Sequence, residues 1–549
     1  MPKEKFIFVI GGVMSGVGKG IASASIGRIL QARGLKVTAV KIDPYINVDA
    51  GTMNPIEHGE VYVTSDGDET DQDIGNYERF LNTNIYRDNY MTTGRVYYSV
   101  IERERNLGYG GKCVEVVPHI PMEVIGRIKR ASQIADADIT IVEIGGTVGE
   151  YQNILFLEAA RMMKLNHSGD VLFVLVSYLP VPSKIGEMKT KPTQTASKML
   201  NSAGIQPDFI LCRADRPIDD PRKEKIAMFC NVHKEEIISA PDADLIYEIP
   251  INFEKENLSE KILAKLGLEI NPIDLNDWQG LVEKINSVKN IIKIGIVGKY
   301  FETGDFILSD VYISVIESLK YASWHNSLKP EIHWINSDIY DSDSEKIDEL
   351  KNYDCLVVPG GFGSRGIEGK IAAIKYAREN KIPFLGLCYG MQLASIEFAR
   401  HVCGLTGAHT TEIRPETENP IIHIMREQAE KLAKKQYGNT MRLGEYPCLL
   451  KTGSLVANLY DKLEISERHR HRYEFNNDYR DMLEEAGLMF SGTSPDNQLV
   501  EIIELPESVH PFFVGTQFHP EFKSRPLNPH PLFLGLIKAG LNRIVSNKM

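Results

Sequence analysis

The chain has 549 residues and a formal net charge of −12, and its length favours two or more domains over a single hydrophobic core. Hydrophobic residues make up 43% and charged residues 25% of it, as in ordinary globular proteins. The acidic balance argues against a nucleic-acid-binding surface as the main function, and no apolar run reaches membrane-spanning length. The seven cysteines form no CxxC pair, so we expect neither a zinc site nor disulfides, and a reduced cytoplasm is the simplest compartment.

Two halves of the chain open with strands of the same character. Residues 6–12 (FIFVIGG) begin the first half and residues 291–300 (IIKIGIVGKY) the second, and short apolar runs alternate with helical patterns through both. This alternation predicts an α/β fold with two doubly wound domains, each a parallel sheet with helices on both faces and ligands at the carboxyl ends of its strands. We expect the domains at 1–268 and 291–549, with a linker that contains one helix at 269–290.

A glycine-rich loop follows the first strand. It reads GGVMSGVGKG at 11–20 and precedes a helical stretch that ends at Gly34. Backbone N–H groups of such a loop, together with the helix dipole, form a phosphate cradle in which Lys19 would reach the distal phosphates. The alternative interpretation, a plain glycine turn, explains neither the lysine nor the helix.

The loop departs from the common P-loop pattern at its end. The spacing from Gly12 to Gly18 is one residue too long, and Gly20 replaces the hydroxyl that would bind magnesium. A metal must therefore be held elsewhere, and the candidates are Asp73 and Glu143, since hard carboxylates suit magnesium. For the acidic segment around Asp73, a solvated loop is the alternative.

A second chemical signal is a cysteine in PFLGLCYGMQLA. Cys388 follows an apolar run and precedes a helical stretch, with Gly386 and Gly390 on either side, which is the layout of a nucleophile elbow. The helix N-terminus would favour the thiolate, the nucleophilic form. His519 and Glu521, in GTQFHPEF, supply a base and the group that orients it. A lone cysteine could be a buried apolar residue, but its glycines and the HPE segment favour a Cys-His-Glu triad.

Longer blocks resemble the CTP synthase family over nearly the whole chain. They are KIDPYINVDAGTMNP (41–55), HGEVYVTSDGDETDQDIGNYERF (58–80), VEIGGTVG (142–149) and KTKPTQ (189–194), in the family's order. The resemblance implies an N-terminal P-loop amidoligase domain, similar to dethiobiotin synthetase, and a C-terminal class I glutamine amidotransferase domain with a triad. The implied reaction is the ATP-dependent amination of UTP at C4 to give CTP, with ammonia from glutamine.

The resemblance also implies site residues in the first domain, with magnesium held by Asp73 and Glu143. The implied ATP-binding residues are Gly16, Val17, Gly18, Lys19, Gly20, Ile21, Lys41, Asp73, Pro241, Asp242 and Ala243. The implied UTP- and CTP-binding residues are Ser15, Glu150, Tyr151, Gln152, Lys189, Thr190, Lys191, Pro192, Thr193, Gln194 and Lys225.

In the second domain the resemblance implies a triad of Cys388, His519 and Glu521. The implied glutamine-binding residues are Gly361, Tyr389, Gly390, Met391, Gln392, Glu412 and Arg472. The implied effectors are GTP as activator and CTP as feedback inhibitor, and the implied assembly is a homotetramer. The family can stack into filaments, and for this chain the resemblance leaves filaments open. No nucleic-acid or membrane partner is expected.

Three places depart from the usual family pattern. Residues 150–152 are Glu-Tyr-Gln where Asp-Ile-Glu is usual, Tyr389 replaces a commoner Leu, and the loop 106–113 (NLGYGGKC) differs. The first change bears on nucleotide contacts and CTP inhibition, and the loop change on ammonia passage. At Tyr389 the change of side chain leaves the backbone N–H, the part needed for an oxyanion hole, unaffected.

Two further segments carry two interpretations each. The cluster RHRHR at 468–472 could be a basic nucleic-acid patch, but it is isolated in an acidic chain, and Arg472 as a clamp for a carboxylate is better motivated. The segment 359–369 (PGGFGSRGIEG) could be a lid that answers to GTP or a plain flexible loop.

Two other functions remain as hypotheses. The first is another amidotransferase, such as a cobyrinic-acid-type amidase, which combines a similar loop with a triad glutaminase. The second is a non-catalytic assembly protein, in which a P-loop ATPase carries a glutaminase-like binding module.

Overall fold

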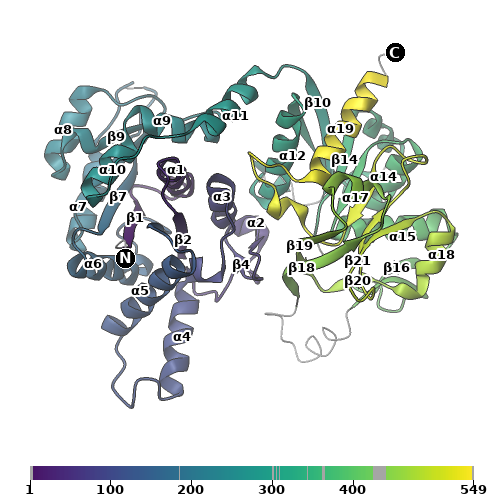
Figure 1. Ribbon diagram of the computed structural model, residues 1–549, viewed down its shortest axis with the longest axis horizontal. Coiled ribbons are helices and arrows are strands. Elements are labelled where there is room, and N and C mark those ends of the chain that lie inside the picture. The colour runs from purple at the N-terminus through teal and green to yellow at the C-terminus, as the bar shows by residue number, and fades with distance from the viewer. Residues whose placement is uncertain are drawn as a thin grey trace. The chain divides into compact units, whose positions relative to one another are not determined.

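The computed structural model describes residues 4–184, 186–298, 302–303, 306–307, 309–342, 344–361, 365–424 and 441–546. Within these ranges, no helix has both the length and the apolar character needed to cross a bilayer. The chain forms two compact units, one from residues up to 50 and 73–282, the other from residues 51–72 and 283 onward. Figure 1 shows both units and labels many of their elements.

The first unit is built on a seven-stranded sheet with the order β5-β2-β6-β1-β7-β8-β9, in which every pairing is parallel. The strands are β1 (Lys5–Gly11), β2 (Val37–Asp43), β5 (Tyr90–Thr92), β6 (Ile139–Ile144), β7 (Val171–Tyr178), β8 (Phe209–Ala214) and β9 (Ile237–Pro241). The central strands are buried along their length, because helices cover both faces of the sheet. The predicted doubly wound α/β domain is thereby confirmed.

The helices of the first unit alternate with these strands. They are α1 (Lys19–Gln31), α3 (Gln72–Leu81), α4 (Thr93–Arg105), α5 (Val116–Ile134), α6 (Ile154–Asn166), α7 (Lys191–Ser202), α8 (Asp220–Cys230), α9 (Ile249–Lys255), α10 (Leu258–Leu266) and α11 (Asn276–Ser287). The last of these is the helix predicted in the linker, and it runs past the end of the first unit at Val282. The predicted domain limits at 268 and 290 remain a prediction.

The second unit contains a nine-stranded sheet with the order β13-β10-β14-β15-β23-β22-β21-β18-β19. The strands are β10 (Ile291–Gly298), β13 (Lys329–Asn336), β14 (Cys355–Val358), β15 (Phe384–Leu387), β18 (Arg442–Leu450), β19 (Glu464–His471), β21 (Met489–Thr493), β22 (Val500–Glu504) and β23 (Phe513–Thr516). The strands from β13 to β23 in this order run parallel, as predicted, and the other four extend the sheet as antiparallel strands. Sequence patterning did not reveal β18 and β19, because β19 buries charged residues such as Glu467 and Arg468 instead of an apolar run.

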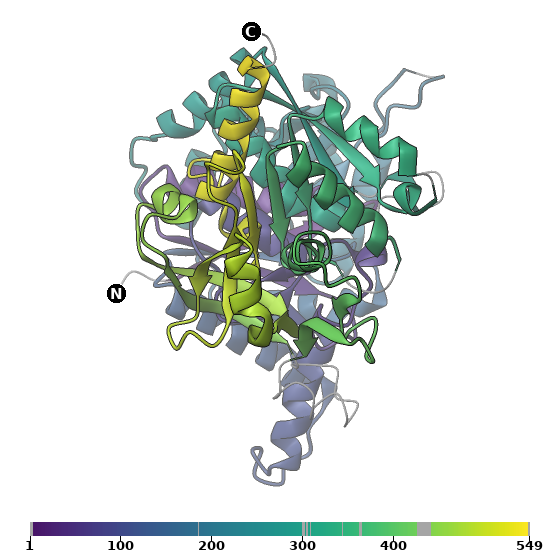
Figure 2. The same cartoon turned by 90° about the vertical axis from the view of Figure 1, so that its right-hand side faces the viewer.

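Helices cover both faces of this second sheet. Leu356, Val358 and Phe384 enter one hydrophobic cluster together with residues of α14 and α15, whereas Val357 and Leu385 enter another with residues of α12 and α19. The helices are α12 (Ile313–His325), α13 (Asp338–Ser342), α14 (Ile367–Glu379), α15 (Tyr389–His401), α17 (Leu455–Tyr460), α18 (Arg480–Glu485) and α19 (Pro531–Ser546), the last drawn in yellow in Figure 2. Smaller strands are β11 (Glu302–Thr303), β12 (Phe306–Ile307), β16 (Ala408–Thr410), β17 (Asn419–Ile424) and β20 (Tyr473–Phe475).

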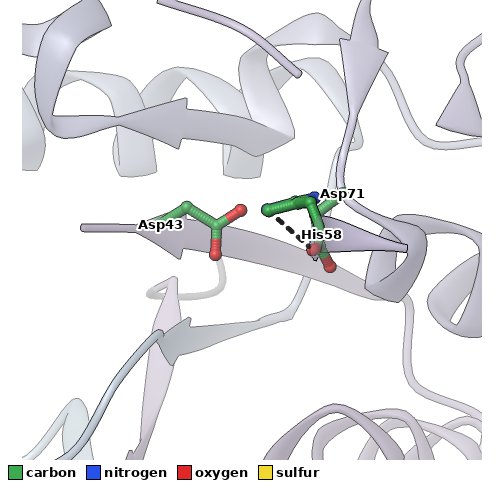
Figure 3. Close-up of side chains that lie close together, drawn as sticks. All are labelled: Asp43, His58 and Asp71. Carbon is green, nitrogen blue, oxygen red and sulfur yellow. Dashed lines mark ion pairs between the residues drawn. The ribbon is translucent and has the colours of Figure 1, made fainter. Parts of the chain in front are cut away.

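One segment of the N-terminal half of the sequence belongs to the second unit. Residues 51–72 form α2 (Pro55–His58) and a hairpin of β3 (Tyr62–Val63) and β4 (Glu69–Thr70). The backbone N–H of Glu445 donates to the carbonyl of Ser65 at 2.8 Å, and Arg470 Nε donates to Glu69 Oε1 at 2.8 Å. Within the segment, His58 Nε2 lies 3.7 Å from Asp71 Oδ2, the dashed ion pair in Figure 3.

Candidate active sites

The strand β15 ends at a tight turn that carries Cys388. This residue has φ 50° and ψ −98°, a strained conformation for a residue with a side chain, and it immediately precedes α15. The turn is tight because its glycines touch backbone: a Cβ on Gly390 would lie 2.1 Å from the carbonyl oxygen of Val358. The backbone N–H of Cys388 donates to Thr516 O on the neighbouring strand β23 at 2.6 Å. These features match the nucleophile elbow predicted from the sequence.

The predicted base and its orienting carboxylate lie beside this turn. His519 and Glu521 follow β23, and His519 Nδ1 lies 2.8 Å from Glu521 Oε1, with both side chains buried. Burial alone would lower the pKa of His519, but the charges of Glu521 and Cys388 outweigh burial and raise it to about 10. The imidazole is therefore held as a cation beside Glu521 and Cys388, and a protonated imidazole next to a cysteine is the arrangement found in enzymes with a cysteine nucleophile.

Cys388 opens onto a cavity of about 510 Å³. The predicted glutamine-binding residues that line it with Cys388 are Gly361, Tyr389, Gln392, Glu412 and Arg472. Gly390 and Met391 do not line the cavity; both are buried residues of α15. Of the segment 359–369, residues 362–364 lie outside the described residues.

Several residues at or next to this cavity were not predicted from the sequence. Gln517 does not line the cavity, but its Nε2 points at Cys388 Sγ at 3.6 Å and its Oε1 accepts from Gln392 Nε2 at 3.1 Å, so two amides lie beside the thiol. His471 also lines the cavity, and burial together with Arg442 lowers its pKa to about 3, which keeps it neutral. The alternation of the RHRHR segment was the available signal for His471. Residues 51–54 line the same cavity, although they lie far away in the sequence.

In the first unit, the glycine loop leads into α1 as predicted. Lys19 is the first residue of the helix, and Gly18 before it has φ 85°, a left-handed conformation that favours glycine. Lys19 Nζ donates to the carbonyl of Gly146 at 2.8 Å, and burial lowers its pKa. Ser15 and Gly16 are exposed, whereas Val17, Gly20 and Ile21 lie against the body of the unit.

The two predicted metal ligands converge on one ammonium group. Lys41 Nζ donates to Glu143 Oε1 at 3.0 Å and is also hydrogen-bonded to Asp73 Oδ2. Burial acts to raise the pKa of Asp73, but Lys41 outweighs burial and the pKa is lowered; the pKa of the more buried Glu143 is raised by desolvation. Two carboxylates that already share a cation fit a divalent metal such as magnesium.

An apolar pocket of about 120 Å³ lies next to the glycine loop. It is lined by Gly18, Ile21, Pro241 and Ala243 of the predicted ATP-binding set. The missed residue here is Arg213, whose Nη1 donates to the carbonyl of Val17 at 3.2 Å and whose Nη2 pairs with Asp242. The guanidinium therefore ties the loop to the segment after β9.

A polar pocket of about 390 Å³ gathers part of the predicted UTP and CTP set. Lys189, Thr190, Lys191 and Lys225 line it, together with Arg222, which the sequence reasoning missed. Thr193 is buried and its hydroxyl lies 2.8 Å from Ser177 Oγ, and Gln194 Nε2 donates to Thr190 Oγ1 at 3.1 Å. Pro192 stands in the first turn of α7.

The Glu-Tyr-Gln departure has a structural consequence at Glu150. Its Oε1 accepts from the backbone N–H of Thr147 at 2.7 Å and from the Thr147 hydroxyl at 2.6 Å, while Gln152 Nε2 donates to Oε2 at 2.6 Å. These bonds outweigh burial and lower the pKa of Glu150. Tyr151 is 93% exposed. This part of the predicted nucleotide set thus presents an anchored carboxylate and a free aromatic ring.

Comparison with known proteins defines the class and then the family. The family model for class-I glutamine amidotransferases matches residues 307–539, in agreement with the Cys-His-Glu site, so the chain carries a glutamine amidotransferase unit. The family model for the CTP synthase N-terminus matches residues 5–268. A solved structure, the glutaminase domain of Trypanosoma brucei CTPS with bound acivicin, is 33% identical, covers 46% of this chain and 94% of its own, and has a TM-score of 0.42.

Full-length relatives cover almost all of the chain. The CTP synthase of Halalkalibacterium halodurans is 50% identical over 541 residues, 98% of this chain and 99% of that protein. The CTP synthase of Methanocaldococcus jannaschii is 51% identical over 543 residues, 98% of each. The chain therefore belongs to the CTP synthase family.

Proposed function

We propose that the chain carries out its family's reaction, the glutamine-dependent amination of UTP to CTP, with a glutaminase in the second unit and an ATP-dependent synthetase in the first. The observation that carries the glutaminase half is the geometry around Cys388. A strained cysteine at a helix start opens onto a cavity, beside a His519–Glu521 pair at 2.8 Å.

Glutamine hydrolysis begins when the Cys388 thiolate attacks the side-chain amide carbon. The backbone N–H groups of Gly361 and Tyr389 receive the resulting oxyanion, a device worth about 3 kcal/mol per donor. His519 gives its proton to the departing ammonia, which leaves a thioester on Cys388. The neutral imidazole then takes a proton from water, which attacks the thioester and releases glutamate. Glu521 keeps the imidazole oriented throughout and does not itself accept the proton.

Recognition of glutamine uses two side chains of opposite charge in the wall of the cavity. Arg472 suits the α-carboxylate, because a guanidinium binds a carboxylate through two parallel hydrogen bonds. Glu412 suits the α-ammonium, and both side chains line the same cavity as Cys388. Gln392 is held by the carbonyl of Tyr473 at 2.9 Å and therefore shapes the wall of this cavity.

The synthetase activates the uracil ring, because its C4 oxygen is a poor leaving group. Transfer of the γ-phosphoryl group of ATP to this oxygen makes a good leaving group, and ammonia displaces it as phosphate. Lys19 and Lys41 stabilise the charge on the transferred group. The apolar pocket beside Gly18 suits the adenine base, and the lysines at 189, 191 and 225 suit the triphosphate of UTP.

Asp73 and Glu143 would hold a magnesium ion, whose charge would neutralise the phosphates of ATP. Gly20 leaves room for the Asp73 carboxylate, and Lys41 orients both carboxylates. Ammonia must reach the activated UTP unprotonated, since ammonium has no free electron pair, and shielding from water serves that end.

Regulation and assembly follow the family in this proposal. GTP activates, CTP inhibits by feedback at the UTP site, and the protein forms a tetramer in the cytoplasm. A reduced compartment suits the thiol chemistry of Cys388. The anchored Glu150 carboxylate and exposed Tyr151 lie where the family pattern differs, so they are the residues through which CTP inhibition would differ here.

The proposal is tested by incubating the purified full-length protein with UTP, ATP, magnesium and glutamine and separating the nucleotides by chromatography. We expect CTP and glutamate in equal amounts. Glutamate without CTP would contradict the proposal and favour another amidotransferase. Absence of both products, with normal binding of ATP, would favour the non-catalytic assembly protein. For a Cys388→Ala variant, Cys403→Ala is the matched control, because Cys403 is a free cysteine that does not line the cavity.

A further inference from the structure

The hairpin β3–β4 brings an N-terminal tyrosine to the glutaminase. Tyr62 is completely buried in the second unit, and its hydroxyl donates to the carbonyl of Phe522 at 2.7 Å. Arg468 Nη1 donates to the same hydroxyl at 3.0 Å and to the carbonyl of Val63 at 3.1 Å. Arg468 is fully buried as well. The position of Tyr62 is therefore fixed from two sides.

Tyr62 also contacts the ring of Phe522. The two ring centres lie 5.0 Å apart with an angle of 64° between the planes, an edge-to-face arrangement. Phe522 is 3% exposed and lies in a short 3₁₀ helix, Pro520–Lys523, directly after Glu521. One side chain thus holds both the backbone and the ring of Phe522.

Phe522 in turn covers the imidazole of His519. Their ring centres lie 5.2 Å apart and the planes differ by only 18°, so the phenyl ring is stacked on the imidazole. The 2.8 Å contact between His519 Nδ1 and Glu521 Oε1 restrains rotation of the imidazole in its plane. The stacked ring restrains its tilt out of that plane, which the carboxylate alone does not do.

We infer that Tyr62 is a positioning residue for glutamine hydrolysis, because it holds Phe522 against His519 and so keeps the imidazole beside Cys388. This inference rests on the proposed roles of Cys388 and His519. It gives Arg468, from the RHRHR segment, a role as support for Tyr62. It also makes the glutaminase depend on residues 51–72, which stand apart from the rest of the second unit in the sequence.

The test compares Tyr62→Ala and Tyr62→Phe in the full-length protein. Tyr62→Ala frees the Phe522 ring, so we expect the glutaminase kcat to fall about 10- to 100-fold, the size of effect that slight misplacement of a catalytic group produces. The KM for glutamine should stay within about twofold, because the substrate contacts are untouched. Tyr62→Phe keeps the ring contact with Phe522 and loses the two hydrogen bonds of the hydroxyl, so we expect a smaller fall in kcat, no more than about fivefold.

Two further variants separate positioning from general loss of structure. Phe522→Leu should reproduce the fall in kcat, and Tyr62→Ala with Phe522→Leu should lose little more than either alone, since both act through one ring. Tyr340→Ala, which removes another buried tyrosine of the second unit, is the matched control and should leave kcat unchanged. CTP formation from added ammonia reports on the first unit and should persist in every variant.

An unchanged kcat in Tyr62→Ala, or an effect on the KM alone, would overturn the inference. So would an equal fall in kcat in Tyr62→Phe and Tyr62→Ala, or a fall in the double variant that equals the product of the two single effects. A separate variant, His519→Asn, tests the proposed function on which this inference rests. Full glutaminase activity in His519→Asn would contradict the proposed triad. Loss of activity in His519→Asn together with a wild-type kcat in Tyr62→Ala would contradict only the role of Tyr62.

Discussion

The carboxylate of Asp73 occupies the space that a side chain on Gly20 would need: a Cβ at position 20 would lie 2.0 Å from Asp73 Oδ1. This relationship explains why the glycine loop lacks the hydroxyl that usually follows the lysine. The proposed metal ligand comes from α3, and the glycine at position 20 leaves the space that its carboxylate occupies.

Restoring the usual hydroxyl should therefore damage the site. We expect Gly20→Ser to lower CTP formation from ammonia, UTP and ATP by about 100-fold, because the new side chain displaces Asp73. Glutamine hydrolysis, measured separately, should continue. Equal synthesis by Gly20→Ser and the wild type would contradict the proposed role of the Asp73 carboxylate.

Loss of Lys41 should make the protein depend on magnesium for stability. Lys41→Met removes the ammonium group that the carboxylates of Asp73 and Glu143 share. Removing one partner of a buried ion pair lowers the free energy of unfolding by about 3 to 5 kcal/mol. We expect a lower melting temperature that magnesium raises more in the variant than in the wild type, measured by calorimetry.

Lys36→Met is the matched control for this experiment. Lys36 also pairs with an aspartate, Asp136, but both side chains are largely exposed, so no change in melting temperature is expected. An equal response of both variants to magnesium would contradict a metal site at Asp73 and Glu143.

The raised pKa of His519 predicts a pH dependence of stability. Since the pKa is about 10 in the folded protein against 6.5 for an ordinary histidine, the charged imidazole stabilises the fold fully below about pH 6.5, and this contribution is lost as the pH rises toward 10. The difference in unfolding free energy between the wild type and His519→Gln should therefore shrink over that window in denaturant titrations. A difference that grows with pH would refute the ion-pair arrangement.

Arg213 should contribute to ATP binding. Arg213→Ala removes the link between Val17 and Asp242 at the edge of the apolar pocket, so we expect the KM for ATP to rise about tenfold with a smaller change in kcat. Arg216→Ala, at an exposed arginine that pairs with its neighbour Asp215, is the control and should leave the KM unchanged. Unchanged ATP kinetics in Arg213→Ala would contradict this role.

The sequence was informative wherever a site is built from residues close together in the chain. Flanking glycines predicted the tight turn at Cys388, and the HPE segment predicted the contact between His519 and Glu521. The missing hydroxyl at Gly20 pointed to carboxylates from elsewhere in the chain, and Asp73 and Glu143 both bind Lys41, although their role as metal ligands stays a prediction. Each of these features has a local physical cause that a short segment displays.

Contacts between distant segments could not be predicted in this way. Tyr62 and residues 51–54 join the second unit through tertiary packing, and no local pattern distinguishes them from the synthetase sequence around them. Gln517, directly after β23, and Arg213, within β8, reach their sites from positions that no local sequence pattern marks. The strand β19 buries arginine and histidine side chains that in most sequences would be exposed, so the nucleic-acid interpretation of RHRHR arose from composition alone.

The most direct test of the account is the nitrogen source used by Cys388→Ala. The account predicts that this variant makes no CTP from glutamine but makes CTP from added ammonia at the wild-type rate, because the cysteine only supplies ammonia. Loss of synthesis from both sources would show that Cys388 is structural. Full synthesis from glutamine would show that Cys388 is not the nucleophile.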